Sequence, residues 1–181
     1  GMSLIFDSHA TDRTVFTFKG PNNEIKFNDV KPFETKWLYY SSLLGDSFVT
    51  QVVIAKKLVF RGVKLALNPS AYLMKKYDVK PLLKLTSILV LNKEEAQLIV
   101  GAWKELEKLY ALGPKIVVIT DALNPVRAYD GEKYYSIVPH KNVKVVERTG
   151  AGDAFASGFV AGIIAGKPID YSLALGLAES E

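Results

Sequence analysis

Short β-type runs and amphipathic helical stretches alternate along most of this chain. The runs rich in Val, Ile, Leu and aromatic residues predict strands at residues 37–40, 64–67, 87–91 and 115–120. Helical patterns predict helices at residues 46–61, with Asp46 as the N-cap, and at residues 71–77, 92 onward, 102–112, 154–165 and 170 onward. Regular alternation of this kind predicts an α/β fold with a mostly parallel sheet.

Two antiparallel hairpins are expected beside this alternation. Residues 13–18 and 24–27 are short β-rich runs around Gly20-Pro21-Asn22-Asn23, a sequence typical of a turn, so we expect residues 11–28 to form a hairpin. Residues 127–129 and 133–138 flank Asp130-Gly131 and predict a second hairpin.

The clearest chemical signal is a turn between a strand and a helix near the C-terminus. Residues 143–146 (Val-Lys-Val-Val) predict the strand, and the apolar run at residues 154–165 predicts the helix. The turn itself consists of Thr149, Gly150, Ala151, Gly152 and Asp153. The first N–H groups of a helix have no internal partner and carry partial positive charge, and glycines let a phosphate approach them closely. This turn therefore predicts an anion-binding site.

Asp153 has two interpretations. In the first turn of a helix, its carboxylate would stabilise the helix dipole, and the glycines would only shape the turn. Held beside a transferring phosphate, the carboxylate would accept the proton of an attacking hydroxyl, a contribution of roughly 10²- to 10⁴-fold in rate. The turn alone supports both interpretations about equally.

Composition narrows the class of protein. A chain of 181 residues with 49% hydrophobic content can bury one ordinary core, so we expect one domain over residues 1–181. The net charge of +4 comes from scattered lysine pairs, which gives little support for nucleic-acid binding. No cysteine is present, and the two histidines, His9 and His140, are isolated, so disulfides and thiolate metal sites are excluded and a zinc site is not expected.

The run at residues 154–165 is the longest apolar stretch of the chain. It is shorter than the ~20 residues of a membrane-spanning helix, so we expect a cytoplasmic protein with no membrane partner. Gly158, Gly162 and Gly166 recur at four-residue spacing, which we expect to let a buried helix lie close to the sheet.

Ligands of parallel α/β sheets bind beyond the carboxyl ends of the strands, so residues that follow strands are candidates for the site. Asn92 and Glu95 follow the strand at residues 87–91, and Thr120 and Asp121 come at the end of the next strand. Asn92 and Glu95 also have the spacing of a capping box, in which each side chain binds the other residue's backbone N–H. A structural cap and a ligand site are compatible interpretations of this pair.

The turn near the C-terminus resembles a known family signature. Thr149-Gly150-Ala151-Gly152-Asp153-Ala154-Phe155, followed by Gly158-Phe159, is similar to the C-terminal motif of the ribokinase-like, or pfkB, carbohydrate kinases. The resemblance implies a three-layer α/β/α fold with a small β lid. It also implies that Asp153 is the catalytic base and that the N–H groups of Gly150, Ala151 and Gly152 form the anion hole. Glu147-Arg148 stands where the family usually has Asp-Thr.

Two further segments resemble the same family. Asn92-x-x-Glu95 is similar to its Asn-x-x-Glu motif, which implies that Asn92 and Glu95 position Mg²⁺ and the nucleotide phosphates; hard oxygen ligands suit this ion. Thr120-Asp121 is similar to the segment that lines the adenine and ribose pocket. The resemblance therefore implies that ATP is contacted by Asn92, Thr120, Asp121 and Thr149. Ala122 stands where the family commonly has a glycine.

The resemblance covers only part of a ribokinase-like kinase. Residues 11–28 correspond to part of the lid over the sugar, and residues 36–181 correspond to the nucleotide-binding and catalytic part. The family's Gly-Gly substrate motif does not occur before residue 13, so the N-terminal substrate-binding portion is expected to be missing. Strands without their usual neighbours leave open edges, and we therefore expect self-association, for instance as a homodimer, through sheet edges or lid strands.

The resemblance implies an ATP-dependent kinase that phosphorylates a hydroxyl group of a sugar or related carbohydrate, with a nucleoside as the alternative acceptor. A second interpretation is a nucleotide-binding fragment that keeps the fold and cannot position an acceptor. The retained Asp153 favours catalysis, and the missing Gly-Gly motif favours the fragment. The third is an unrelated α/β binding module whose anion loop arose by chance.

Overall fold

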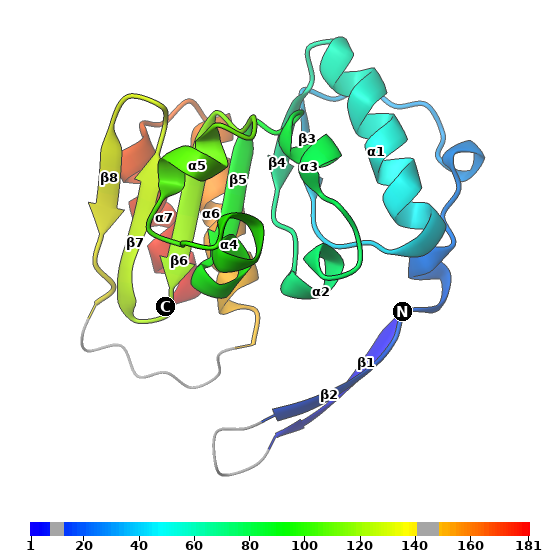
Figure 1. Cartoon of the computed structure of the whole chain (residues 1–181), viewed down its shortest axis with the longest axis horizontal. Coiled ribbons are helices and arrows are strands. Elements are labelled where there is room, and N and C mark those ends of the chain that lie inside the picture. The colour runs from blue at the N-terminus through cyan, green and yellow to red at the C-terminus, as the bar shows by residue number, and fades with distance from the viewer. Residues whose placement is uncertain (8–12, 141–148) are drawn as a thin grey trace.

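A computed structural model describes residues 1–7, 13–140 and 149–181 of the chain (Figure 1). Within these residues, the body is built on a six-stranded sheet of order β3-β4-β5-β6-β7-β8. The strands are β3 (Trp37–Tyr40), β4 (Lys64–Leu67), β5 (Ile88–Asn92), β6 (Ile116–Asp121), β7 (Asn124–Tyr129) and β8 (Tyr134–Ile137). β3 to β6 run parallel, and β7 and β8 are antiparallel. The predicted mostly parallel sheet and the hairpin across Asp130-Gly131 are confirmed.

Buried side chains of the strands alternate between two helical layers, as strand geometry requires. Leu89 and Leu91 of β5 belong to the core on one face, whereas Ile88 and Val90 belong to the core on the other. Five helices cover the first face: α1 (Gly45–Phe60), α2 (Ala71–Met74), α3 (Lys80–Leu83), α4 (Lys93–Val100) and α5 (Leu106–Tyr110). α6 (Ala151–Ile164) and α7 (Ile169–Ser180) cover the second face and lie behind the sheet in Figure 1. The predicted three-layer α/β/α arrangement is confirmed.

The N-terminal hairpin uses a different partner strand from the predicted one. β2 (Arg13–Phe18) pairs antiparallel with β1 (Met2–Asp7) rather than with residues 24–27. The segment after β2 instead forms two 3-10 turns, η1 (Gly20–Asn23) and η2 (Phe27–Asp29). Side chains of α1 take the backbone groups that a strand ladder would use, because the Ile25 N–H donates to Ser47 Oγ at 2.9 Å and Thr50 Oγ1 donates to the Ile25 carbonyl at 2.8 Å. The predicted hairpin over residues 11–28 was therefore wrong in its second strand.

The β1–β2 hairpin extends away from the body of the molecule (Figure 1). Many of its apolar side chains are exposed: Met2, Leu4, Ile5, Phe6, Val15, Phe16 and Phe18. Phe6 and Phe16 contact one another edge to face, with ring centroids 5.8 Å apart. Consecutive residues of a strand point to opposite faces, so both faces of the hairpin present apolar surface to solvent.

The N-terminus of α1 differs from the prediction. The N-cap is Leu44, which makes no capping bond with its side chain, and Asp46 lies inside the first turn. The helix begins early because Gly45 adopts a φ of +60° and its N–H donates to the Tyr77 hydroxyl at 2.9 Å. A tertiary contact thus replaces the predicted aspartate cap. α2 and α5 are shorter than the predicted ranges of 71–77 and 102–112.

Gly158 and Gly162 of α6 pack against α7 rather than against the sheet. A Cβ at Gly158 would lie 3.0 Å from Gly176 Cα, and one at Gly162 would lie 3.0 Å from Ser172 Cα. The four-residue spacing therefore brings two helices close together, which corrects the predicted contact with the sheet. In the part of the chain that the structure describes, the helices are too short or too polar to cross a bilayer.

Candidate functional site

The first turn of α6 presents open backbone N–H groups. Gly150 is the N-cap with a φ of +86°, a conformation that favours glycine, and no side chain of the described residues caps the helix. The first intrahelical bond runs from the Ala154 N–H to the Gly150 carbonyl, at 2.8 Å, so the N–H groups of Ala151, Gly152 and Asp153 precede the helical ladder. A Cβ at Gly150 or Gly152 would meet no atom of the described residues within 4 Å. This turn has the space and the polarity to hold an anion.

Thr149 precedes this turn, and Asp153 lies exposed within it. The strand predicted at residues 143–146, and Glu147-Arg148, lie outside the described residues.

The second part of the site is the start of α4. Asn92 Oδ1 accepts the Glu95 N–H at 2.8 Å, and Glu95 Oε2 accepts the Asn92 N–H at 2.8 Å. The predicted capping box is confirmed. Its two hydrogen bonds fix the Glu95 side chain against the helix terminus, so one carboxylate oxygen is committed to the cap and the carboxylate has a defined orientation.

The electrostatics of Glu95 connect this cap with the first turn of α6. Burial raises the pKa of Glu95 above its usual 4.5, and the negative charges of Glu94 and Asp153 raise it further. The N–H groups of Asn92 and Ala71 act in the opposite direction and partly offset these effects. Glu95 is therefore a partly desolvated carboxylate within electrostatic reach of Asp153, although 58 residues separate the two in sequence (153 − 95).

The end of β6 lies beside the same cap. Asn92 and Thr120 are register partners in the parallel β5–β6 pair, and Thr120 Oγ1 donates to the Leu91 carbonyl at 3.4 Å. Asp121 has its own partners, because its Oδ2 lies 3.6 Å from Lys93 Nζ and accepts a hydrogen bond from Asn124 Nδ2 at 3.3 Å. The charge of Asp121 is thus balanced by Lys93.

The loop after β6 contains a strained residue. Ala122 has a φ of +48°, in the left-handed region that favours glycine, and this is the position where glycine is common in the family that the sequence resembles. An alanine there costs roughly 1 kcal/mol relative to an unstrained backbone. The loop therefore keeps the backbone shape of a glycine loop in spite of the substitution.

Sequence reasoning missed two features of this edge. Tyr39, the third residue of β3, has a pKa raised by burial and then by the charge of Asp153, so it lies within electrostatic reach of Asp153. Tyr39 could have been identified from the sequence, because ligands bind near the carboxyl ends of parallel strands and Tyr39 lies near the end of β3. Lys93 Nζ also lies 4.8 Å from the centroid of the Trp103 ring, which Arg127 approaches at 5.2 Å. No pattern in the sequence pairs these residues.

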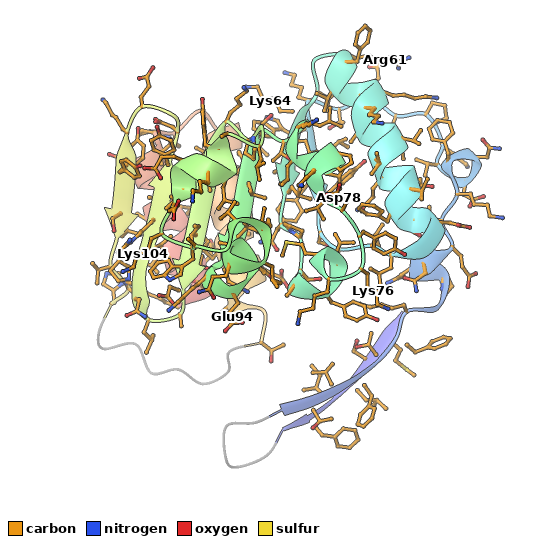
Figure 2. All side chains as sticks on the ribbon, in the orientation of Figure 1. Arg61, Lys64, Lys76, Asp78, Glu94 and Lys104 are labelled. Atoms are coloured by element: carbon orange, nitrogen blue, oxygen red, sulfur yellow. The ribbon has the colours of Figure 1, made fainter. Side chains whose placement is uncertain are left out.

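The predicted site residues come from separate segments and gather at the carboxyl edge of the sheet. In Figure 1 this edge faces the bottom of the view, where α6 begins, and Figure 2 labels Glu94, the neighbour of Glu95, at the same edge. Among residues 1–7, 13–140 and 149–181, no group of three or more His, Cys, Asp or Glu is placed to hold a metal ion. Mg²⁺ usually takes only one or two protein carboxylates and completes its shell with water and phosphate oxygens, so Glu95 and Asn92 suit it chemically.

The sequence of the chain is similar to those of known kinases. The profile described as pfkB family carbohydrate kinase matches residues 1–180. A cytidine kinase of Thermococcus kodakarensis is 33% identical over 134 residues, which cover 70% of this chain and 48% of that protein. The chain thus spans about half the length of this relative.

Solved structures show the same fold. A probable sugar kinase from Rhizobium etli superposes with a TM-score of 0.83 at 23% identity, covering 98% of this chain and 58% of the other. The nucleoside kinase of Methanocaldococcus jannaschii, an archaeal member of the ribokinase family, gives a TM-score of 0.82 at 20% identity, covering 98% of this chain and 59% of the other. The predicted ribokinase-like fold is confirmed.

Proposed function

The chain belongs to the pfkB family of carbohydrate kinases, and we propose that it transfers a phosphoryl group from ATP to a hydroxyl group of a sugar or related carbohydrate. The observation that carries this proposal is the meeting of two segments: the open first turn of α6, with Asp153 in it, lies within electrostatic reach of Glu95 at the start of α4. A base, an anion-binding turn and a fixed carboxylate then share one solvent-accessible edge.

In the proposed reaction, the hydroxyl oxygen of the acceptor attacks the terminal phosphorus of ATP. The bond from that phosphorus to the bridging oxygen breaks, ADP leaves with the electron pair, and the hydroxyl proton passes to the Asp153 carboxylate. The N–H groups of Gly150, Ala151 and Gly152, together with the positive end of the α6 dipole, stabilise the charge on the transferring phosphoryl group.

Asn92 and Glu95 would position Mg²⁺ through the Glu95 carboxylate and bound water, and the ion would supply positive charge beside the phosphate oxygens. We assign Thr120 and Thr149 to contacts with the nucleotide, because they lie beside Asn92 and Gly150 respectively. Asp121 would support the nucleotide-binding loop through its contacts with Lys93 and Asn124.

A nucleoside is the second candidate acceptor, since the Thermococcus relative is a cytidine kinase and several curated relatives are adenosine kinases. Sugars and nucleosides offer the same reacting group, a sugar hydroxyl. Acceptor-dependent ADP release, measured with a panel of free sugars and nucleosides, distinguishes the two candidates.

The decisive experiment compares Asp153→Asn with Asp170→Asn. Asp170 also lies in the first turn of a helix, α7, so both variants remove a carboxylate that complements a helix dipole. We expect Asp153→Asn to lower acceptor-dependent ATP turnover by at least about 100-fold, because the general base is lost. Asp170→Asn should retain turnover. Equal turnover in both variants would show that Asp153 has only a structural role.

The alternative is a nucleotide-binding fragment without catalysis, and the coverage of about half of the Thermococcus relative keeps it open to test. Calorimetric titration with a non-hydrolysable ATP analogue, with and without Mg²⁺, separates the two interpretations. Magnesium-dependent binding without acceptor-dependent turnover in the unmodified chain would support the fragment. Binding that survives Asp153→Asn while turnover disappears would support the kinase.

We also propose that the chain associates with a second copy of itself through the β1–β2 hairpin. The hairpin exposes 55% of Leu4 and 62% of Phe16, which are register partners, and both of its outer edges have free backbone groups within the described residues. An isolated two-stranded hairpin is at best marginally stable in water, so pairing with another hairpin would bury apolar surface and complete the edges.

A further inference from the structure

A groove lies between the C-terminal half of α1 and the chain at residues 27–33, which runs beside that helix in Figure 1. It encloses about 510 Å³. Sites for small molecules are commonly about 300 to 1,000 Å³, so the groove has the size of a ligand site. Figure 2 labels Arg61, one of its lining residues, at the opposite edge of the molecule from Glu94 of the candidate active site. The groove is therefore separate from that site.

The walls of the groove are apolar on both sides. Six apolar side chains line it: Phe27, Val30, Pro32 and Phe33 from the chain segment, and Ile54 and Leu58 from α1. Phe27 and Phe33 remain 39% and 45% exposed, so their rings offer surface that no other described residue covers. Aromatic rings stack on flat partners with a gain of about 0.5 to 1.5 kcal/mol beyond area burial. The walls therefore favour a ligand with a flat, apolar ring.

The charged residues that line the groove are all positive. Lys31, Lys57 and Arg61 line it together with the neutral Asn28, and none of the lining residues is Asp or Glu. Within the described part of the chain, none of these three cations forms an ion pair with a carboxylate. Lys57 Nζ lies 4.0 Å from the centroid of the Phe27 ring, which places one charge directly at an apolar wall.

Two carboxylates, Asp29 and Glu34, adjoin lining residues in sequence, and neither forms an ion pair with a cation of the groove. Asp29 Oδ2 accepts the Lys26 N–H at 2.8 Å within the turn η2. Because no carboxylate of the described residues pairs with them, the cations of the groove can still bind an anion. Arg61 can bind a phosphate or carboxylate with two parallel N–H groups, and Lys57 can add a point charge from the same helix.

We infer that this groove binds a small aromatic anion, a flat ring that carries a phosphate or a carboxylate. The ring lies against Phe27, Phe33 and the apolar side of α1, and the anionic group faces Lys57 and Arg61. Apolar walls reject an inorganic anion that cannot use them, and the uncompensated positive charge disfavours a cationic ring. The inference concerns a surface remote from the proposed phosphoryl-transfer site and does not depend on that function.

Phenyl phosphate is a suitable probe, because its two halves can be tested separately. We expect it to cause saturable shifts in the amide NMR signals of residues 27–33 and 54–61 of ¹⁵N-labelled protein. Inorganic phosphate and benzyl alcohol, which represent the two halves, should bind at least about tenfold more weakly, since each lacks one set of contacts. Shifts confined to residues 149–154, or equal shifts with inorganic phosphate, would overturn the inference.

The matched variants are Lys57→Gln and Lys56→Gln. Both remove one positive charge from adjacent exposed positions of α1, but only Lys57 lines the groove. Lys57→Gln, alone or with Arg61→Gln, should lower the affinity for phenyl phosphate by about tenfold for each charged contact that is lost. Lys56→Gln should leave this affinity unchanged. Equal loss in both single variants would indicate general electrostatic attraction and would refute a built site. Unchanged circular dichroism in all variants would exclude unfolding as the cause.

Discussion

Replacing Gly150 or Gly152 of the α6 turn with alanine should separate the folding role of this turn from its proposed role in binding phosphate. Gly150 has a φ of +86°, whereas Gly152 lies within the helix. A Cβ at either position meets no atom of residues 1–7, 13–140 or 149–181 within 4 Å, so the added methyl group causes no steric clash with them. The two variants therefore differ only in backbone conformation, and the structure predicts opposite effects on the free energy of unfolding.

The expected magnitudes follow from the two conformations. An alanine at Gly150 adopts left-handed geometry at a cost of roughly 1 to 2 kcal/mol. At Gly152, alanine restricts the unfolded chain and favours the helix, which should stabilise the protein by about 0.5 kcal/mol or slightly more. Urea denaturation followed by circular dichroism measures both changes, through midpoints at an unchanged slope.

Activity should respond differently from stability. If phosphate lies on this turn, both methyl groups occupy space in front of its N–H donors, and both variants should bind an ATP analogue more weakly. The Gly152→Ala variant should thus be more stable and less active than the unmodified chain. A loss of stability in Gly152→Ala, or an unchanged stability in Gly150→Ala, would refute the backbone reasoning. Unchanged nucleotide affinity in both would refute the anion hole.

Two further predictions concern the capping box and the hairpin. Glu95→Gln keeps an acceptor for the Asn92 N–H, whereas Glu95→Ala loses the cap and should destabilise the protein by about 1 kcal/mol, which urea denaturation measures. The folded state raises the pKa of Glu95, so the contribution of Glu95 to the free energy of unfolding is greatest at low pH and is lost as pH rises through the folded-state pKa. Glu95→Gln cannot titrate and should therefore reduce the fall in stability between about pH 4 and 7. An unchanged pH profile of stability would contradict this. Phe16→Ser should shift the chain toward monomer in sedimentation velocity, and Phe60→Ser, another exposed phenylalanine, should not; equal behaviour of the two variants would exclude the hairpin as the interface.

The sequence predicted those strands, caps and turns whose structure is decided by residues close together in the chain. β5 and β6 are runs of β-branched and leucine residues, and burial on both faces makes such runs recognisable. The Asn92–Glu95 cap depends only on a three-residue spacing and the two side chains involved. The hairpin at Asp130 is equally local, because Asp130 Oδ1 accepts the N–H groups of Glu132 and Lys133 within the turn.

The errors share one cause, which is competition from distant residues. Residues 24–27 have strand-like composition, but Ser47 and Thr50 bind the backbone of Ile25 and prevent a ladder there. Asp46 is a good N-cap residue, but the contact of Gly45 with Tyr77 starts the helix earlier. In both cases the deciding partner lies more than 20 residues away, so no local pattern could reveal it.

The same distinction applies to the candidate site. The placement of Asn92, Thr120 and Asp153 at the sheet edge was predictable, because Asn92 and Thr120 lie at the ends of strands and Asp153 lies in the first turn of a helix that begins at that edge. The proximity of Glu95 and Tyr39 to Asp153 was not, since it depends on how α4, β3 and α6 pack on the sheet. Likewise, the pairing of Asp121 with Lys93 could be seen only in the structure.

The cap and the proposed ligand site at Glu95 are coupled through the charge of its carboxylate. The capping bonds hold the carboxylate in a partly buried position, and burial, followed by the charges of Glu94 and Asp153, raises the pKa of Glu95. A bound cation would offset the repulsion from these charges, and a phosphate that accompanies it would be held by the α6 turn. Cation and nucleotide should therefore bind with positive cooperativity, each increasing the affinity of the other by the same factor. In Glu95→Gln, the repulsion is absent before any ligand binds, so this reciprocal gain should decrease even though the cap remains. A cooperativity that stays unchanged in Glu95→Gln would place the cation elsewhere and leave Glu95 with the cap as its sole role.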